Sequence, residues 1–328
     1  MKKFSLLVCL LVFAVAFSVA GLSSDGHAAK KTVVGFSQIG AESEWRTAMS
    51  DNVKEAIEKA GYVLKFSDAQ QKQENQLKAI RAFIAQKVDF IVLAPVVQTG
   101  WDAVLQEARN AKIPVIIVNR SIKVSTGKPE DYYLTFLGPD NIEAGRIATR
   151  WFVDYMKNRP GDINMVVLEG TVGSSSAVER KTGFDEIIKA NPRFKVIKSQ
   201  SGDFTRARGK EVMEAFLKSA KAEGKTIDAL FAHCDDMAIG AIQAIEEAGL
   251  KPGKDIIIFA IDGVKGAFEA MAAGKMNCTT ENPNEYGPAL VKIIKEYTAK
   301  KTINKRIVLE NKVYPQEVAA KELPNRKF

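Results

Sequence analysis

The sequence predicts an α/β protein of two similar lobes, each built around a doubly wound parallel sheet. Along its 328 residues, short apolar runs typical of strands alternate with segments whose apolar residues recur at helical spacing. The apolar runs are continuous, which is typical of parallel strands covered by helices on both faces. The pattern starts again near residue 133, and one sheet would not hold all of these strands comfortably, so we expect a second sheet.

Each predicted element follows from its own stretch of sequence. In the first half, the expected strands are residues 32–36, 63–66, 90–94 and 114–118, with helices over 48–60, 77–84 and 101–111. In the second half, the expected strands are residues 133–137, 165–168, 194–197, 229–232, 256–260 and 276–280. The helices expected there are residues 141–156, 174–188, 205–217, 237–248, 267–272 and 286–297. No linker rich in Gly, Pro or Ser separates the halves, so we expect short crossings and a ligand cleft between the lobes.

Residues 1–29 have the pattern of a secretory signal peptide. Met1, Lys2 and Lys3 form a positive end, residues 4–20 are almost wholly apolar, and small residues follow. A membrane anchor is the alternative, because the apolar run approaches spanning length, but its abrupt change to small residues favours cleavage. We expect cleavage between residues 20 and 29, and the sequence does not choose the site.

Export limits the partners and the redox chemistry of the chain. The formal net charge is +8, and it falls to +7 without residues 1–29, which carry two lysines and one aspartate. We do not expect an exported protein to bind nucleic acid. Cys234 and Cys278 remain after cleavage and could pair in an oxidising compartment, although a chain of this length does not need a disulfide.

Catalytic, metal and nucleotide signatures are mostly absent. His27 leaves with the signal peptide, and His233 alone cannot build a histidine-based metal site. Residues 173–176 (GSSS) resemble a nucleophile elbow only loosely and are typical of a capped helix start. No glycine-rich dinucleotide or phosphate loop follows the first strand. Asp235 and Asp236 are more typical of a helix N-terminus than of an acid–base or metal site. We therefore expect no metal, no cofactor and no enzymatic activity.

Polar side chains follow several strands at what would be one edge of both sheets. After the first strand, residues 42–46 carry two carboxylates, a tryptophan and an arginine. The others are Asn119, Arg120, Thr171, Arg180, His233, Cys234, Asp235, Asp262 and Glu281. Taken alone, the 42–46 loop could be a solvated turn whose Trp45 covers the core. The recurrence at one edge favours a polar ligand between two sheets, and an aromatic face beside charged groups suits a sugar.

Several short motifs are shared with a known family. They are residues 33–38 (VVGFSQ), 70–76 (QQKQENQ), 94–97 (APVV), 120–121 (RS), 168–173 (LEGTVG), 200–206 (QSGDFTR), 235–237 (DDM) with 239–241 (IGA), and 261–263 (IDG). In these motifs the chain resembles the periplasmic sugar-binding proteins of ABC importers, in the ribose- and galactose-binding branch. The resemblance covers essentially the whole chain after the signal peptide, and it implies the two-lobed fold of a type I periplasmic binding protein.

The resemblance also implies roles for matching residues. Trp45 would stack on the sugar ring, while Glu42 and Arg46 would bond its hydroxyls. Arg120 and Arg180 would donate from either side of the cleft. The predicted ligand-binding residues are Glu42, Ser43, Glu44, Trp45, Arg46, Asn119, Arg120, Arg180, Cys234 and Asp262.

Asp262 and Phe204 match the family pattern, which implies that Asp262 would accept from the sugar and that Phe204 would close the far wall. Two other positions depart from the pattern. Where the family commonly has Asp before the arginine, this chain has Asn119, and where it commonly has Asn before the aspartate pair, this chain has Cys234. Cysteine is a weak hydrogen-bonding group. The ligand therefore stays open among galactofuranose, a related hexose, a pentose and a small polyol.

The resemblance implies the solute-binding component of an ABC sugar importer, a periplasmic monomer that captures a galactofuranose-like or related sugar by hinge closure and delivers it to a membrane permease. The expected lobes are residues 30–138 plus 282–309, and 139–281 plus 310–328. A protein that reports to a chemoreceptor or sensor kinase is the alternative. A repressor's effector-binding part would need a DNA-binding motif where the signal peptide stands. A carbohydrate-active enzyme would need two carboxylates facing one bond, such as Glu42 or Glu44 with Asp262.

Overall fold

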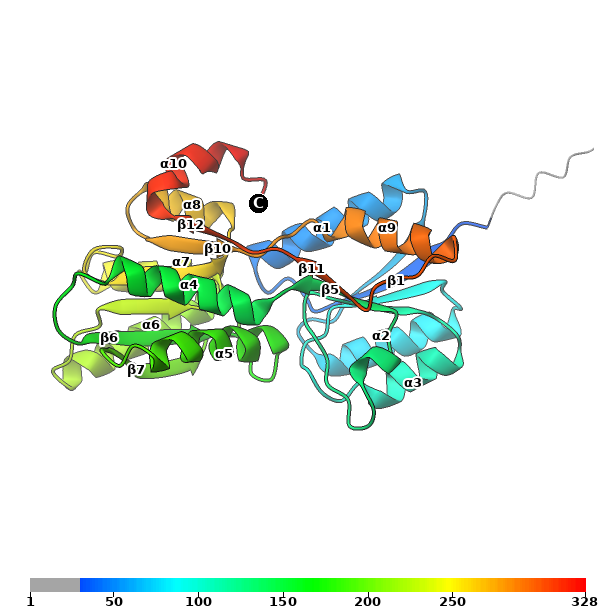
Figure 1. Cartoon of the computed structure of the whole chain (residues 1–328), viewed down its shortest axis with the longest axis horizontal. Helices are drawn as coiled ribbons and strands as arrows, with labels where there is room; N and C mark the ends of the chain where they lie inside the picture. The colour runs from blue at the N-terminus through cyan, green and yellow to red at the C-terminus, as the bar shows by residue number, and fades with distance from the viewer. Residues whose placement is uncertain (1–29) are drawn as a thin grey trace, which may run out of the picture. The chain divides into compact units, whose positions relative to one another are not determined.

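Two six-stranded sheets carry the fold, and the structure, a computed structural model, describes residues 30–328 (Figure 1). The first sheet has the order β11-β5-β4-β3-β1-β2, and all of its pairs are parallel. Its strands are β1 (Val33–Gln38), β2 (Val63–Asp68), β3 (Phe90–Leu93), β4 (Val115–Val118), β5 (Thr135–Pro139) and β11 (Arg306–Leu309). The signal peptide predicted over residues 1–29 lies outside the described residues.

The second sheet repeats this arrangement, in the order β12-β10-β9-β8-β6-β7. Its strands are β6 (Ile163–Glu169), β7 (Phe194–Ser201), β8 (Ala229–Ala232), β9 (Ile257–Asp262), β10 (Cys278–Glu281) and β12 (Lys312–Pro315). β12 runs antiparallel to β10, and the other pairs of this sheet are parallel. The predicted fold class, two α/β lobes around parallel-dominated sheets, is confirmed.

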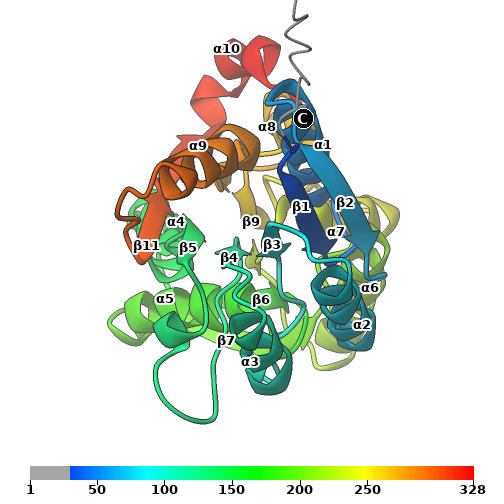
Figure 2. The same cartoon turned by 90° about the vertical axis from the view of Figure 1, so that its right-hand side faces the viewer.

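Helices cover both faces of each sheet. They are α1 (Glu44–Lys59), α2 (Gln73–Ala85), α3 (Asp102–Asn110), α4 (Asn141–Tyr155), α5 (Ser175–Lys189), α6 (Arg206–Ala222), α7 (Asp235–Glu247), α8 (Lys265–Ala272), α9 (Tyr286–Thr298) and α10 (Ala319–Glu322). Figure 2 shows α2 and α3 on one face of the first sheet and α9 on the other. Within the described part of the chain, no helix combines the length and the apolar character that a membrane crossing needs.

Local sequence explains where several helices begin. Ser43, Asp140, Ser174 and Thr205 each precede a helix, and each side-chain oxygen accepts a hydrogen bond from the backbone N–H three residues later. The helix start expected at the serine-rich segment 173–176 is one of these caps. The caps at Ser43 and Ser174 fix the first turns of α1 and α5, and so fix the directions in which the side chains of these turns point.

The core explains why the apolar runs are continuous. The central strands β3, β4, β8 and β9 are buried along their whole length. Between the second sheet and its helices α4 and α5, Phe152, Phe259, Phe231 and Phe184 form a stack whose successive ring centroids are 4.6, 4.8 and 4.9 Å apart. The edge strands β2 and β7 are half exposed. The strand predicted over residues 194–197 continues to Ser201 as β7. The prediction stopped early because the remaining residues of the strand are polar and carry no apolar signal.

The chain crosses between the sheets after β5, after β10 and between β11 and β12. After β10 it returns to the first sheet as α9, which lies beside α1 (Figure 1). The backbone N–H of Gly287 donates to Asn52 Oδ1 at 2.7 Å and joins these two helices. β11 and β12 were not predicted as strands, because they are short and only half buried. The predicted lobe boundaries stay a prediction.

Candidate functional site

A cavity lies among the ends of β1, β4, β9 and β10 and the first turns of α1 and α5. Residues from both sheets line it, namely Glu42, Ser43, Trp45, Arg46, Asn119, Arg120, Ser176, Arg180, Phe204, Asp262 and Asn282. The lining side chains leave a cavity of only about 10 Å³. Carboxyl ends of parallel strands meet at this edge, as the sequence predicted for a ligand site in an open α/β fold.

The first lobe contributes a carboxylate that serves two guanidinium groups. Glu42 Oε1 accepts from Arg120 Nη2 at 2.7 Å and from Arg46 Nη2 at 3.2 Å. All three side chains are less than 5% exposed. Burial, together with repulsion from Arg46 and Arg180, lowers the pKa of Arg120 to about 10, although Glu42 opposes the change. This half of the cavity therefore holds two cations and one anion.

Asn119 joins the same group from the end of β4. Its Oδ1 accepts from Arg46 Nη2 at 2.8 Å, and its Nδ2 donates to the Tyr286 hydroxyl at 3.4 Å. Its backbone φ is 63°, in the left-handed region that asparagine tolerates better than most residues. Asn119 thus connects the site to α9.

The second lobe contributes an ion pair of its own. Arg180 on α5 donates from Nη2 to Asp262 Oδ1 at 3.0 Å and from Nε to Asn141 Oδ1 at 3.2 Å. Its Nη1 donates to the carbonyl of His233. Burial raises the pKa of Asp262 to about 6, and the Arg180 guanidinium opposes the rise. The side chain of Asn141 and the carbonyl of His233 therefore hold Arg180 in place beside Asp262.

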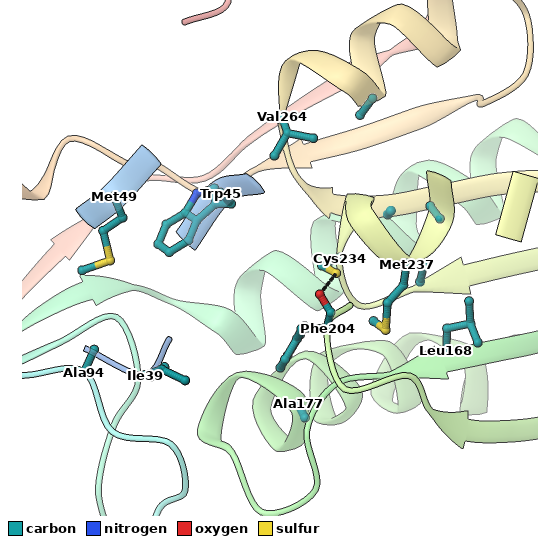
Figure 3. Close-up of a cluster of buried hydrophobic side chains, with 14 of the residues drawn as sticks. Ile39, Trp45, Met49, Ala94, Leu168, Ala177, Phe204, Cys234, Met237 and Val264 are labelled. Atoms are coloured by element: carbon teal, nitrogen blue, oxygen red, sulfur yellow. Dashed lines mark hydrogen bonds between the residues drawn. The ribbon is translucent and has the colours of Figure 1, made fainter. Parts of the chain in front are cut away.

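Two aromatic rings complete the lining. The indole N–H of Trp45 donates to the carbonyl of Asn282 at 2.7 Å. This bond fixes the Trp45 ring against the segment that follows β10. Phe204 has a φ of 59°, and its ring lies 5.0 Å from the Arg120 guanidinium. Figure 3 shows Trp45 and Phe204 in one cluster, with the Cys234 thiol beside the Phe204 backbone. A Cβ at Gly170 would lie 1.9 Å from Phe204 Cζ, so only glycine leaves room for this ring.

Three buried polar atoms of the lining have no hydrogen-bond partner among the described residues. They are Glu42 Oε2, Arg120 Nε and Asn282 Oδ1. An unsatisfied buried polar atom costs about 1–3 kcal/mol. Two acceptors and one donor on residues that line one cavity therefore favour a ligand whose groups both donate and accept, as hydroxyl groups do.

Eight of the ten predicted site residues line this cavity, and Glu44 and Cys234 do not. The Glu44 carboxylate lies 3.4 Å from Arg206 Nη2, and burial and the charge of Asp236 raise its pKa. It points away because successive helical residues face different directions. Cys234 is fully buried, and its thiol donates to the carbonyl of Phe204 at 3.6 Å. Burial raises the pKa of this thiol.

The site also contains residues outside the predicted set. Ser176 belongs to the serine-rich helix start, and its position two residues after the Ser174 cap is the signal that could have found it. Asn282 follows Glu281 at the crossing, and only the fold brings it to the cavity. Phe204, expected as the far wall, lines the cavity. Of the remaining polar series, His233 is buried, and its Nδ1 accepts from the N–H of Gly170 at 3.3 Å.

The two cysteines and the acidic pair Asp235 and Asp236 are buried. Cys234 and Cys278 are both buried and free. Asp235 accepts from the backbone N–H groups of Gly263 and Val264, at 2.6 and 3.0 Å, and so supports the end of β9. In the range from residue 30 to 328, no group of three or more His, Cys, Asp or Glu side chains is arranged to hold a metal ion.

The chain is similar in sequence to known proteins that bind sugars. A family model described as a periplasmic binding protein domain matches residues 34–302. The galactofuranose-binding protein YtfQ of Escherichia coli (strain K12) is 49% identical, over 97% of this chain and 97% of the relative. The fructose import binding protein FruE of Bifidobacterium longum (strain NCC 2705) is 35% identical, over 96% of this chain and 93% of the relative.

Two solved structures extend the comparison to three dimensions. One is the periplasmic binding protein component of the arabinose ABC transporter from Shewanella sp. ANA-3, bound to α- and β-L-arabinofuranose. It has a TM-score of 0.85 and 48% identity, over 90% of this chain and 96% of that chain. The other is a galactofuranose binding protein, with a TM-score of 0.86 and 47% identity over 90% of this chain and 98% of that chain.

Proposed function

Because this chain belongs to the periplasmic binding protein domain family, we propose that it is the solute-binding component of an ABC sugar importer. The relatives named for galactofuranose and arabinofuranose support a furanose sugar as its ligand. We place the protein in the periplasm as a monomer that delivers the sugar, chemically unchanged, to a permease in the membrane.

The observation that carries this proposal is the set of unpaired polar atoms in a buried, charged cavity. Glu42 Oε2 and Asn282 Oδ1 would accept from sugar hydroxyls, and Arg120 Nε would donate to a hydroxyl or ring oxygen. Hydrogen bonds to charged groups are stronger than those between neutral groups. Trp45 and Phe204 supply apolar faces for the C–H side of the ring.

The two ion pairs have complementary roles in this proposal. Arg46 and Arg120 present donors from the first lobe, oriented by Glu42, while Arg180 and Asp262 present a donor and an acceptor from the second lobe. A sugar that bonds to both sets stabilises the arrangement in which the lobes are together. Binding and closure are then the same event.

Closure is supported by direct bonds between loops of the two lobes. The N–H of Gln98 donates to the carbonyl of Gly173 at 2.9 Å, and the N–H of Ser121 donates to Ser175 Oγ at 2.8 Å. A cavity of about 10 Å³ has room for about one water molecule, so this form has to open to admit a sugar. We propose that the lobes separate at the three crossings, with the boundaries predicted from the sequence, and close again on the ligand.

Thermal shift and calorimetry on residues 30–328 test the proposal. We expect D-galactose or L-arabinose, which both interconvert between ring forms, to raise the melting temperature. Ligand at 1,000 times its Kd stabilises the folded state by about 4 kcal/mol. Arg120→Ala should abolish the effect, whereas Arg109→Ala, at an exposed position on α3, should not. A screen of pentoses, hexoses and polyols without any shift would contradict the proposal. Recovery of altered sugar after incubation would contradict binding without chemistry.

The importer and sensor alternatives differ in the partner. Deletion of the gene should stop uptake of the labelled sugar if the protein feeds a permease. Unchanged uptake together with lost chemotaxis or lost transcriptional response to the sugar would favour a receptor or sensor kinase as the partner.

A further inference from the structure

The end of the chain packs against the second lobe through Arg326. The Arg326 guanidinium carbon lies 4.0 Å from the ring centroid of Phe268 on α8 and 4.3 Å from that of Tyr314 on β12. Only 10% of the Arg326 side chain is exposed, and its Nη1 lies 2.6 Å from Glu281 Oε1. The main-chain oxygen of Phe328 accepts from the backbone N–H of Lys265 at 2.5 Å. The final residues are therefore fixed on α8 and directed at Glu281.

Glu281 occupies the crossing through which the chain leaves the second sheet. It is the last residue of β10, and its Oε2 accepts from the Tyr314 hydroxyl at 3.3 Å. Its carbonyl accepts from Asn311 Nδ2 at 3.0 Å, and Asn311 lies in the crossing between β11 and β12. Glu281 thus connects two of the three crossings with the end of the chain.

The same residue is next to the ligand site without being part of it. Glu281 pairs with Asp262 in the β9–β10 ladder, and the N–H of Asn282 donates to the carbonyl of Asp262 at 3.0 Å. Asp262 and Asn282 line the cavity, whereas Glu281 does not. A rotation of the backbone at Glu281 would therefore move two lining residues relative to each other.

We infer that Arg326 is a positioning residue for ligand capture, which holds Glu281 at the crossing and so favours the closed arrangement of the lobes. The inference rests on the proposed function. A guanidinium can lie against two aromatic rings and bond a carboxylate at the same time, because it is flat, weakly hydrated and carries several donors. Without this cation, the half-buried Glu281 carboxylate would keep only the Tyr314 hydroxyl and the charge of Lys312, its partner on β12, so the closed geometry of the crossing becomes less favourable.

The consequence is an effect on affinity from outside the cavity. The apparent Kd equals the intrinsic Kd divided by the fraction of protein in the competent state. If the loss of Arg326 lowers the closed fraction, the apparent Kd rises by the same factor, even though every residue that lines the cavity is unchanged.

The test combines sugar affinity with a direct measure of closure. The substitutions Arg109→Cys on α3 and Lys189→Cys on α5, both at exposed positions, carry a fluorescent donor and acceptor for distance measurement between the lobes. We expect Arg326→Ala to shift the ligand-free distribution towards the open distance. It should also raise the Kd for D-galactose or L-arabinose by about 3- to 10-fold, mainly through faster dissociation.

Two further variants separate this role from general stability. Arg326→Lys keeps the charge but loses the guanidinium contacts with Phe268 and Tyr314, so its Kd and distance distribution should lie between those of the wild type and Arg326→Ala. Lys321→Ala, at an exposed position on α10, should leave both unchanged. If Arg326→Ala and Arg326→Lys melt earlier but keep the wild-type Kd and distances, the inference is wrong. If the wild type binds none of the sugars, the proposed function fails, and the ligand-free distances still decide the role of Arg326.

Discussion

Arg46 and Arg120 share one carboxylate oxygen, Glu42 Oε1, in the buried half of the first lobe. Arg46 has Asn119 as a second partner, and Arg120 has the carbonyl of Val96 at 3.2 Å. Two guanidinium groups near one anion are stable only while that anion stays in place. At the scale of single residues, the site therefore depends on Glu42 more than on either arginine.

Glu42→Gln should lower the free energy of unfolding by about 3–5 kcal/mol, because it leaves two buried cations without a carboxylate. Sugar affinity should fall as well, since both arginines lose their orientation. Urea unfolding and calorimetry measure these effects. Glu55→Gln, at an exposed residue on α1 that pairs with Lys59, is the matched control and should change neither value. An unchanged unfolding midpoint in Glu42→Gln would show that the arginines find other partners.

Asp262 should make sugar binding depend on pH. Burial raises its pKa from 3.8 to about 6. Because the ionised carboxylate is the better acceptor, affinity should weaken as the pH falls through 6, by at most about tenfold per pH unit. Calorimetry at pH 5 and pH 7.5 tests this, and Asp262→Asn should remove the dependence. Equal wild-type affinities at pH 5 and pH 7.5 would contradict the prediction that ionised Asp262 binds the sugar.

The raised pKa of Asp262 affects the stability of the ligand-free protein in the opposite direction to the sugar affinity. A folded-state pKa above the unfolded value means that the folded protein binds the proton more tightly. The contribution of Asp262 to the free energy of unfolding is therefore full below about pH 4 and is lost as the pH rises through 6. Affinity and ligand-free stability should thus change in opposite directions over this range.

At the scale of elements, α4 and α5 approach so closely that their contact requires glycine. A Cβ at Gly183 would lie 2.0 Å from the carbonyl oxygen of Ile142, and one at Gly145 would lie 2.3 Å from that of Arg180. α5 carries Arg180 into the cavity. The position of this donor is therefore set by the packing of two helices as well as by its own hydrogen bonds.

Gly183→Ala should push α5 away from α4, with a loss of stability of about 1–3 kcal/mol or more from overpacking. We expect weaker sugar binding in addition, because Arg180 moves with the helix. Thermal unfolding and calorimetry test both effects. Lys189→Ala, at the exposed end of the same helix, should leave both near the wild-type values. If Gly183→Ala is destabilised but keeps the wild-type affinity, the packing of α4 on α5 does not set the position of Arg180.

The first turn of α1 also contacts α6 and α7 outside the cavity. Arg206 Nη2 lies 3.4 Å from Glu44 Oε2 and 2.8 Å from Asp236 Oδ1. The backbone N–H of Glu44 donates to Asp236 Oδ2 at 2.9 Å. This explains the position of Glu44, which the sequence predicted in the ligand site, and makes it a contact between lobes at the rim.

Glu44→Gln should speed sugar dissociation only modestly, by about 2- to 5-fold at low salt. The pair is more than one-third exposed, and exposed pairs contribute about 0.2–1 kcal/mol. Stopped-flow dissociation at low and at about 0.5 M salt tests this, since screening should remove the difference between variant and wild type. Lys54→Gln, which breaks an exposed pair on the same helix, is the control. A difference that persists at high salt would point to a direct contact with the sugar.

At the scale of the whole molecule, the bonds between the lobes and the tight cavity connect ligand capture with movement at the three crossings. We expect sugar to lower the radius of gyration measured by X-ray scattering, because contacts to both lobes stabilise the closed state. Arg180→Ala should weaken this response, since it removes the donor from the second lobe, while Arg109→Ala should not. An identical scattering curve with and without bound sugar would contradict hinge closure.

Much of this architecture could be predicted from local sequence. Strand-like runs and helical periodicity report burial over a few residues, and burial in a parallel sheet depends on the same few residues. Edge strands β11 and β12 lacked that signal, because they are short and half exposed. Polar residues after strands indicated the site edge, since the carboxyl ends of parallel strands meet there.

The sequence by itself therefore determined the two parallel-dominated lobes, the edge that holds the cavity and most of the residues at that edge, because these depend on short-range patterns. Only the tertiary structure decided which of those side chains face the cavity. Glu44 turns to the rim, Cys234 bonds to the backbone of Phe204, and Asn282 reaches the site from a distant crossing. The physical reason is that a side chain's direction depends on packing and on partners far away in sequence, such as Glu42 and Arg120, which are 78 residues apart.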